Sequence, residues 1–167
     1  KSMLAAGKLS VENGAHIVTQ QFLDSFLILS GSGITFGLVI AMLFAAKSKQ
    51  YKALGKVAAF PAIFNVNEPV VFGFPIVMNP VMFLPFILVP ILAAVVVYGS
   101  IAIGFMQPFS GVTLPWSTPA IISGFMVGGW QGAIVQVIVL GISTLVYFPF
   151  FKFQDKLAYA NELEAEK

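Results

Sequence analysis

Residues 64–75 read FNVNEPVVFGFP, and the carboxylate of Glu68 within them is the only charge in residues 57–151. A water-soluble domain of that length needs charged side chains on its surface. The stretch is therefore expected to lie in a bilayer, where an ionisable group costs at least about 2.5–3.5 kcal/mol on insertion scales. Such a group is retained only where it has a function, so Glu68 is the first candidate for a functional site.

The composition agrees with a chain that lies largely in a membrane. Hydrophobic residues make up 58% of the 167 residues, charged residues only 10%, and the mean hydropathy is +0.92. All basic residues are lysines, and lysines beside apolar segments mark cytoplasmic loops. A net charge of +2 is too small to predict nucleic-acid binding. The chain starts without Met or a signal-peptide pattern, so we interpret it as the rear part of a larger membrane protein.

The sequence offers few residues for catalysis or metal binding. It contains no Cys and one His, His16, so neither a thiolate site nor a multi-histidine metal site is expected. Gly31 and Gly33 have no Lys behind them, which argues against a phosphate-binding loop. We therefore expect no catalytic residue, no cofactor and no metal in this chain.

Residues 57–80 differ from the other apolar segments because they are rich in proline. The prolines are Pro61, Pro69, Pro75 and Pro80. They would break a straight helix about every seven residues. Irregular backbone at membrane depth is tolerated where it is buried in protein or lines a cavity. The pattern predicts a re-entrant hairpin with a polar tip at Asn65–Pro69.

Three further apolar segments predict membrane-spanning helices. They are residues 25–46, 81–106 and 124–151. A helix rises 1.5 Å per residue, so each is long enough to cross a hydrocarbon core of about 30 Å. In the first of them, Gly33 and Gly37 either allow close helix packing or break the helix.

The positions of the lysines support this map. If the basic connector at residues 47–56 and the end from Lys152 are both cytoplasmic, the chain between them crosses an even number of times. Two spans and one hairpin, separated by a polar-aromatic break at residues 107–123, satisfy that condition. The predicted fold is an all-α polytopic membrane protein with broken helices. Residues 1–152 form its membrane half, and residues 153–167 form a cytoplasmic tail, either a short helix or a linker.

The first 24 residues allow two interpretations. Asn13, His16, Gln20 and Asp24 are spaced three, four and four residues apart, which places them on one face of a helix. The helix is either amphipathic and lies at the membrane interface, or it turns a polar stripe toward a pathway.

Several roles are open for the polar residues of the membrane segments. Glu68 could couple to a proton, pair with a positive group outside this chain, or accept hydrogen bonds from a polyhydroxylated ligand beside Asn67. A structural alternative is that Glu68 caps broken helix ends. Trp116, within PWSTP at residues 115–119, either stacks on the apolar face of a sugar or belongs to the interfacial aromatic belt. Trp130 is interpreted as a belt residue.

The sequence NVNEPVVFGFP at residues 65–75 resembles the Asn-Glu-Pro signature of enzyme IIC, the sugar-transporting membrane component of the bacterial phosphoenolpyruvate-dependent phosphotransferase system. With Asn79-Pro80 and the later LPWSTP at residues 114–119, it is similar to the lactose/cellobiose branch of that family. The resemblance runs from about residue 10 to residue 150. It implies an all-helical rear half with two re-entrant hairpins, in a protein whose front half forms a homodimer in the lipid bilayer.

The resemblance also implies a ligand and a partner. Asn67 and Glu68 would contact the hydroxyls of a disaccharide, and Trp116 would lie near the sugar. A cytoplasmic IIB component would then phosphorylate the sugar from a phosphocysteine, so no phosphoryl-carrying residue is expected in this chain. The family's functional His lies well before the signature, whereas His16 is close to it; His16 is therefore a tentative site residue only.

Two other classes of function compete with this interpretation. An ion- or proton-coupled secondary transporter would also place broken helices around a single membrane carboxylate. A membrane-embedded enzyme would need a second catalytic group, which the apolar segments do not supply.

Overall fold

The computed structural model describes residues 22–74, 76–107 and 114–165, and every regular element within these ranges is helical. The predicted all-α class is confirmed. The elements in chain order are η2 (Leu23–Leu27), η3 (Ser32–Ile34), α3 (Phe36–Ala45), α4 (Lys49–Ile63), α5 (Glu68–Gly73), η4 (Ile76–Met78), α6 (Pro80–Ala102) and α7 (Ile122–Ala165).

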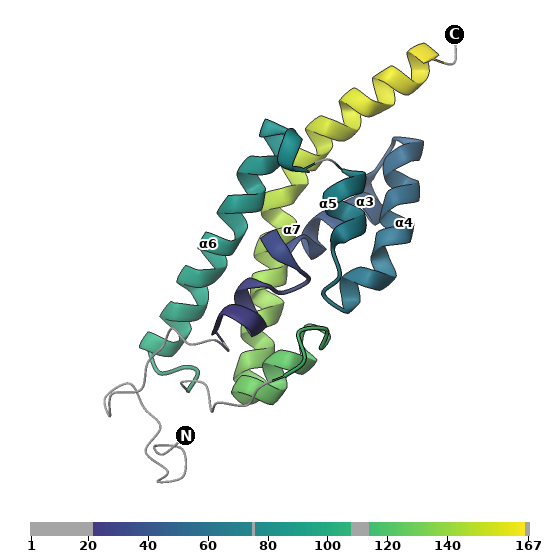
Figure 1. Cartoon of the computed structure of the whole chain (residues 1–167). Helices are drawn as coiled ribbons and strands as arrows, with labels where there is room; N and C mark the ends of the chain where they lie inside the picture. Colours follow the sequence, from purple (N-terminus) through teal and green to yellow (C-terminus); the bar gives the residue numbers. More distant parts are fainter. Residues whose placement is uncertain (1–21, 75, 108–113, 166–167) are drawn as a thin grey trace.

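Helices α6 and α7 are the two longest elements and pack against each other in opposite directions (Figure 1). Both are long and apolar enough to cross a membrane. Leu23–Ile34 and α3 form a third apolar path, which is bent by 47° at its break. Helix α3 contacts both α7 and α4, so this third path joins the long helix to the hairpin.

The break in the third path lies at residues 28–35 and depends on glycine. Gly33 has a φ of 77°, and a Cβ on it would lie 2.3 Å from the ring of Phe86 on α6. Gly37 allows α3 to pack closely against α7, because a Cβ on Gly37 would lie 2.4 Å from the backbone of Ser143. Both alternatives left open by the sequence are therefore realised, one at each glycine.

The predicted hairpin is confirmed, and it begins earlier than expected. Helix α4 runs to Ile63, the chain turns at residues 64–67, and α5 runs back beside α4 (Figure 1). Helix α6 then starts at the same end of the molecule as α4. The expectation of a separate basic connector at residues 47–56 is wrong, because most of that segment is the first part of α4. Ser48 starts the helix, since its hydroxyl accepts a hydrogen bond from the Tyr51 amide.

Two of the prolines that break the segment also begin helices. Pro69 lies in the first turn of α5, and Pro80 opens α6. A missing N–H is tolerated at these positions, because first-turn amides have no partner within the helix. The side chain of Asn79 accepts hydrogen bonds from the amides that follow Pro80 and so caps α6.

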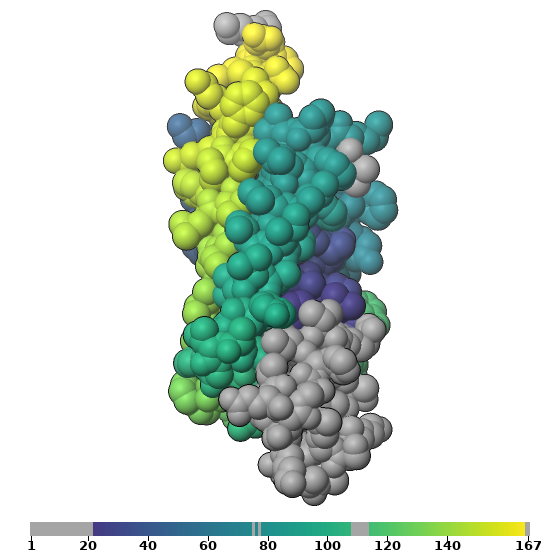
Figure 2. Space-filling model, turned by 90° about the vertical axis from the view of Figure 1, so that its left-hand side faces the viewer, coloured from purple at the N-terminus to yellow at the C-terminus, as the bar shows by residue number. Residues whose placement is uncertain are grey.

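Helix α7 continues from the apolar span into the charged tail. It runs to Ala165 with one kink at Gly129, where φ is 64°. The tail is therefore helical as far as Ala165, as a direct extension of the span, and it projects beyond the other helices (Figures 1 and 2). The backbone has no break at residue 152, and the division into a membrane half and a cytoplasmic tail stays a prediction.

Large apolar side chains cover much of the described surface. Phe44 is 86% exposed, Phe72 is 79% exposed and Leu145 is 75% exposed. A soluble monomer rarely exposes so much contiguous apolar area, whereas a bilayer or further protein segments would cover it. The described fold is that of a polytopic membrane protein with a re-entrant hairpin and broken helices.

Candidate functional site

The tip of the hairpin is anchored in the broken segment at residues 28–35. Asn67 donates from Nδ2 to the backbone oxygen of Ser32 at 2.7 Å and to its hydroxyl at 3.4 Å. Gly31 makes room for the amide, because a Cβ on Gly31 would lie 2.3 Å from Cγ of Asn67. The Asn of the signature is thus buried and held in place by a segment that precedes it by more than thirty residues.

A second asparagine, Asn65, joins three separate parts of the chain. Its Nδ2 donates to the backbone oxygens of Trp116 at 2.7 Å and Thr118 at 2.9 Å. Its Oδ1 accepts a hydrogen bond from the Ser30 amide at 2.7 Å. Asn65 has a φ of 63°, a left-handed conformation that asparagine tolerates better than most residues. One side chain therefore fixes the hairpin tip, the broken segment and residues 114–119, here called the tryptophan loop, relative to one another.

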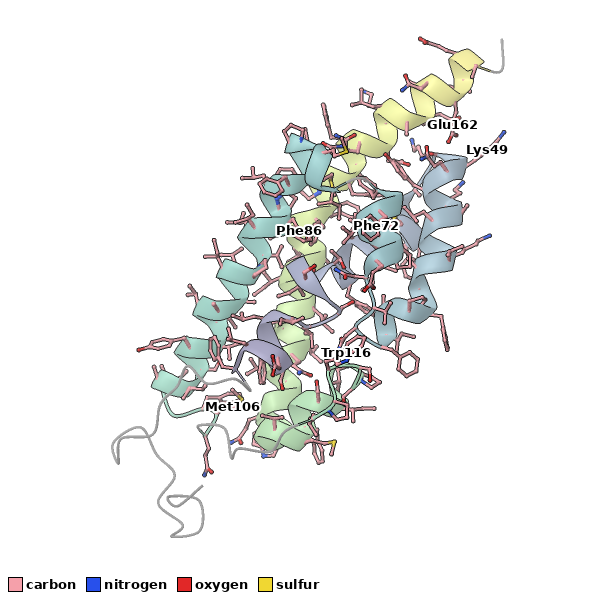
Figure 3. The ribbon with its side chains drawn as sticks, viewed as in Figure 1. Lys49, Phe72, Phe86, Met106, Trp116 and Glu162 are labelled. Atoms are coloured by element: carbon pink, nitrogen blue, oxygen red, sulfur yellow. The ribbon has the colours of Figure 1, made fainter. Side chains whose placement is uncertain are left out.

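The tryptophan loop lies next to the end of the hairpin, as Figure 3 shows for Trp116. The residue is 67% exposed, and Asn65 holds its backbone. The recess between this loop and η2, lined also by Ser25 and Ser123, holds only about 10 Å³ of free volume. That is room for about one water molecule, so no sugar fits between the described residues of this recess.

Glu68 stands beside Asn67 as the first residue of α5, and its side chain is exposed. Within the described parts of the chain, its carboxylate makes no hydrogen bond and no ion pair, and it caps no helix end. The structural alternative, in which Glu68 pins broken helices together, therefore finds no contact to support it here. Asn67 and Glu68 are adjacent at the tip, and Asn65 links that tip to Trp116, whereas His16 lies outside the described residues.

Helix α7 supplies polar side chains that hydrogen-bond to the backbone of the third apolar path at its break. Ser143 donates from its hydroxyl to the Ile34 oxygen at 2.5 Å, and the Tyr147 hydroxyl donates to the Gly33 oxygen at 2.8 Å. Both side chains are fully buried. A helix interrupted in a membrane leaves backbone groups without partners, and these side chains replace the missing ones.

Gln136, also on α7, hydrogen-bonds to the backbone at the other end of the third apolar path, in η2. Its Nε2 donates to the Ser25 oxygen at 2.7 Å and to the Ser123 hydroxyl at 2.8 Å. Its Oε1 accepts from the amides of Ile121 and Gly124 at 2.5 and 3.0 Å. Sequence reasoning missed this residue, although a glutamine inside an apolar span is a visible signal of a buried polar contact.

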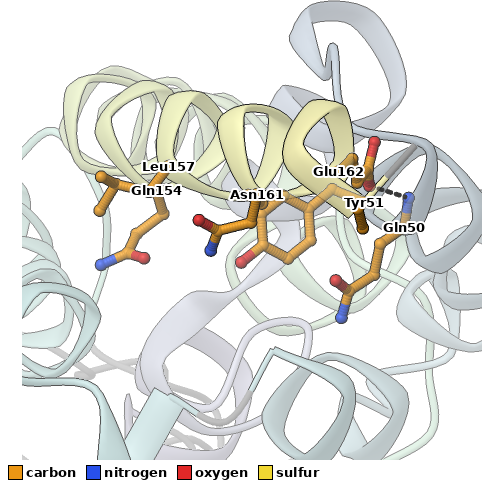
Figure 4. A pocket seen from close by; sticks show the side chains of 8 residues that line it. Gln50, Tyr51, Gln154, Leu157, Asn161 and Glu162 are labelled. Atoms are coloured by element: carbon orange, nitrogen blue, oxygen red, sulfur yellow. Dashed lines mark hydrogen bonds between the residues drawn. The ribbon is translucent and has the colours of Figure 1, made fainter. Parts of the chain in front are cut away.

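Two carboxylates on α7 bind the start of the hairpin. Asp155 is buried and accepts from the amides of Lys47 and Ser48 at 2.8–3.0 Å. Glu162 accepts from the Ser48 hydroxyl at 2.6 Å and from the amides of Lys49 and Gln50 at 3.0 and 3.1 Å (Figures 3 and 4). Because the first amides of a helix lack partners and carry its positive dipole end, carboxylates stabilise this terminus. The hairpin is therefore tied to the projecting end of α7.

The pKa of the Glu162 carboxyl lies below its ordinary value of 4.5. The largest cause is the hydrogen bond from the Ser48 hydroxyl, and the hydrogen bonds from the amides of Lys49 and Gln50 lower the pKa further. Because this pKa is lowered on folding, the contact stabilises the fold at pH values above the ordinary pKa. The stabilisation is lost as the pH falls through the lowered pKa of the folded protein. We expect Glu162→Gln to accelerate amide exchange at Lys49 and Gln50 at neutral pH. In the wild type, protection corrected for intrinsic exchange should persist at pH 5 and decline toward pH 3.

Hydrogen-exchange mass spectrometry of the start of α4 checks this expectation. Glu164→Gln is the matched control, because it removes the same charge from the same helix. Glu164 is exposed and makes no hydrogen bond to the described residues. Equal protection in the Glu162→Gln and Glu164→Gln proteins would show that the Glu162 contact does not hold the hairpin.

Comparisons with known proteins bear on this arrangement. Residues 1–90 match a family model described as "Phosphotransferase system, EIIC". The chain is 45% identical to the lichenan permease IIC component of Bacillus subtilis over 152 residues, which is 89% of this chain and 34% of that protein. It is 46% identical over 149 residues to the cellobiose-specific EIIC component of Geobacillus stearothermophilus, covering 88% of this chain and 33% of the relative.

A solved structure is similar as well. It is the crystal structure of ChbC, described as the IIC component of an N,N'-diacetylchitobiose-specific phosphotransferase system. The TM-score is 0.85 at 40% identity, over 87% of this chain and 34% of that one. The chain thus spans about a third of the length of the proteins it matches.

Proposed function

The chain belongs to the phosphotransferase system EIIC family, and on that premise we propose that it forms the sugar-binding part of a bacterial plasma-membrane permease. The proposed ligand is a disaccharide of the cellobiose, lactose or chitobiose type. The names of the similar proteins support this class, because they include a cellobiose-specific and a diacetylchitobiose-specific component.

The observation that carries the proposal is the joint anchoring of the hairpin tip and the tryptophan loop. Asn65 connects the two, while Asn67 is fixed to Ser32, so the tip has little freedom to move relative to its surroundings. Within the described residues, Glu68 is left with an exposed carboxylate that has no partner. A carboxylate in an apolar setting is well suited to accept hydrogen bonds from sugar hydroxyls, and an exposed indole ring is suited to stack on a sugar face.

The proposed mechanism is vectorial transfer of the sugar. The disaccharide binds against the exposed side chains of Glu68 at the tip and of Trp116 in the tryptophan loop, together with segments outside this chain. The membrane half then moves and presents the sugar to the cytoplasm. A sugar hydroxyl oxygen then bonds to the phosphorus of a phosphocysteine on a IIB partner as the S–P bond breaks, and the hydroxyl proton leaves with the cysteine as its free thiol. The chain has no Cys, so it does not donate the phosphoryl group itself.

A comparison of the two tryptophans tests the proposed binding role. We expect Trp116→Ala to weaken disaccharide binding, because the indole surface that packs on the C–H face of the sugar is lost. Stacking of a nucleic-acid base on an aromatic side chain contributes about 1–3 kcal/mol, and on that scale the loss is about 5- to 150-fold. Trp130→Ala should keep the wild-type disaccharide affinity and lower the stability of the protein instead. The Trp130 ring is 60% exposed and packs edge-on against Phe105, with 6.1 Å between the ring centres. The measurement is calorimetric titration of the full-length proteins with cellobiose, lactose and N,N'-diacetylchitobiose.

Unchanged affinity in both folded variants would return Trp116 to the aromatic-belt interpretation. A loss of disaccharide affinity confined to Trp130→Ala would show that Trp130, and not Trp116, contacts the sugar. If no disaccharide binds the wild type and transport requires a cation or proton gradient, the secondary-transporter alternative would replace the proposal.

A further inference from the structure

A second cavity lies at the lysine-rich end of the molecule, away from the hairpin tip. It is open on one side and holds about 490 Å³ between the end of α3 and the extension of α7. Three lysines, one aspartate and two aromatic residues supply its functional groups; they are Lys47, Lys152, Lys156, Asp155, Phe153 and Tyr159. The family signature and the proposed sugar site use none of these residues.

The cavity carries an excess of positive charge within the described part of the chain, with three lysines and one carboxylate in its lining. Its one carboxylate, Asp155, is only 3% exposed and is occupied by the backbone amides of Lys47 and Ser48. No ammonium group of Lys47, Lys152 or Lys156 forms an ion pair or a hydrogen bond with the described residues. All three side chains are exposed. The cavity therefore presents three ammonium groups that have no carboxylate partner among the described residues, around a carboxylate that is already satisfied.

The cavity also lies where a lipid headgroup would be. Helix α3 ends at Ala45 and the charge-free part of α7 ends at Phe151, so both apolar segments stop at its rim. Lys152 does not extend away from the apolar segment; its Nζ lies 4.8 Å from the centre of the Phe148 ring, one turn back along α7. Lysines at membrane interfaces normally extend toward water, so this direction keeps the cation at the level of the headgroups.

We propose that the cavity formed by Lys47, Lys152 and Lys156 binds the phosphate headgroup of an anionic phospholipid. Clustered lysines beside a membrane-spanning helix attract anionic lipid, and pockets of this kind bind phospholipid headgroups. The half-exposed rings of Phe153 and Tyr159 suit the interfacial region around that headgroup. The lipid would hold the end of α3 and the extension of α7 together, near the contact of Asp155 with Lys47.

Two pairs of lysines allow a matched test on the full-length protein. Lys152→Gln/Lys156→Gln removes two charges one helical turn apart inside the cavity. Lys52→Gln/Lys56→Gln removes two charges at the same spacing on α4, also exposed but outside the cavity. Native mass spectrometry during lipid titration measures binding of phosphatidylglycerol, with phosphatidylcholine as the neutral lipid. Disaccharide affinity, measured on the same samples, checks folding and keeps this test independent of the sugar site.

The wild type should retain phosphatidylglycerol in preference to phosphatidylcholine. The cavity pair should weaken phosphatidylglycerol binding by about 30-fold, which corresponds to about 2 kcal/mol at 1.4 kcal/mol per tenfold. The control pair should stay within about threefold of the wild type. Equal weakening in both pairs would reduce the effect to general surface charge and overturn the proposal, as would no weakening in the cavity pair. Displacement of the lipid by millimolar inorganic phosphate would make the cavity a site for free phosphate and would also overturn it.

Discussion

The Glu68→Gln protein is expected to reach the membrane in normal amount and to lose nearly all disaccharide uptake. Glutamine keeps the size and one acceptor oxygen of the side chain but removes the charge. Hydrogen bonds to a charged group contribute about 1.5–3 kcal/mol, so disaccharide affinity should fall by about 10- to 150-fold. Folding should be unaffected, since the carboxylate makes no hydrogen bond or ion pair within the described residues.

Uptake of labelled disaccharide, normalised to membrane abundance, is the measurement. Glu164→Gln is the control, because it makes the same substitution at an exposed position on the α7 extension. Normal uptake by Glu68→Gln at normal abundance would remove Glu68 from the sugar site. Loss of the protein from the membrane would instead favour the structural-pin role.

The Asn65→Gly protein is expected to lose sugar affinity as severely as the Trp116→Ala protein, although the tryptophan ring is still present. Glycine accepts the φ of 63° at this position, so the substitution removes the side chain without straining the backbone. It leaves the Ser30 amide and the carbonyls of Trp116 and Thr118 without their partner. An unsatisfied buried group such as the Ser30 amide costs about 1–3 kcal/mol, and the loss of the two partly buried contacts to Trp116 and Thr118 should let the tryptophan loop separate from the hairpin tip.

Calorimetric titration and thermal unfolding of the full-length protein check this result. Asn79→Gly is the matched control: it removes a side chain that caps α6 and accepts a hydrogen bond from Gln154 on α7, at the end of the hairpin opposite its tip. Glycine at a helix N-cap costs only a few tenths of a kcal/mol, and sugar affinity should not change. Wild-type affinity in Asn65→Gly would show that the tryptophan loop does not depend on Asn65.

The sequence was sufficient to predict the elements that depend on local chemistry. One carboxylate among apolar residues placed the chain in a membrane, and the prolines of residues 57–80 predicted the hairpin and its tip. The family resemblance was confirmed by the comparisons. These features could be recognised because solvation cost and proline geometry act on the residue and its immediate neighbours.

Other features depend on contacts between distant residues, and the sequence did not reveal them. The lysines at residues 47–56 predict a connector, because nothing nearby in the sequence shows that Asp155 and Glu162 bind the start of α4. The role of Asn65 depends on carbonyls more than fifty residues later. Gly33 and Gly37 are compatible with either close packing or a break in the helix, and hydrogen bonds from side chains of α7 stabilise the break at Gly33 and Ile34.

The most direct test is the position of the sugar in a structure of the full-length protein with a bound disaccharide. The account predicts that density for the sugar contacts the side chains of Asn67 and Glu68 and lies against the ring of Trp116, with the Asn65 hydrogen bonds to the tryptophan loop intact. Sugar density that touches none of these three side chains would contradict it.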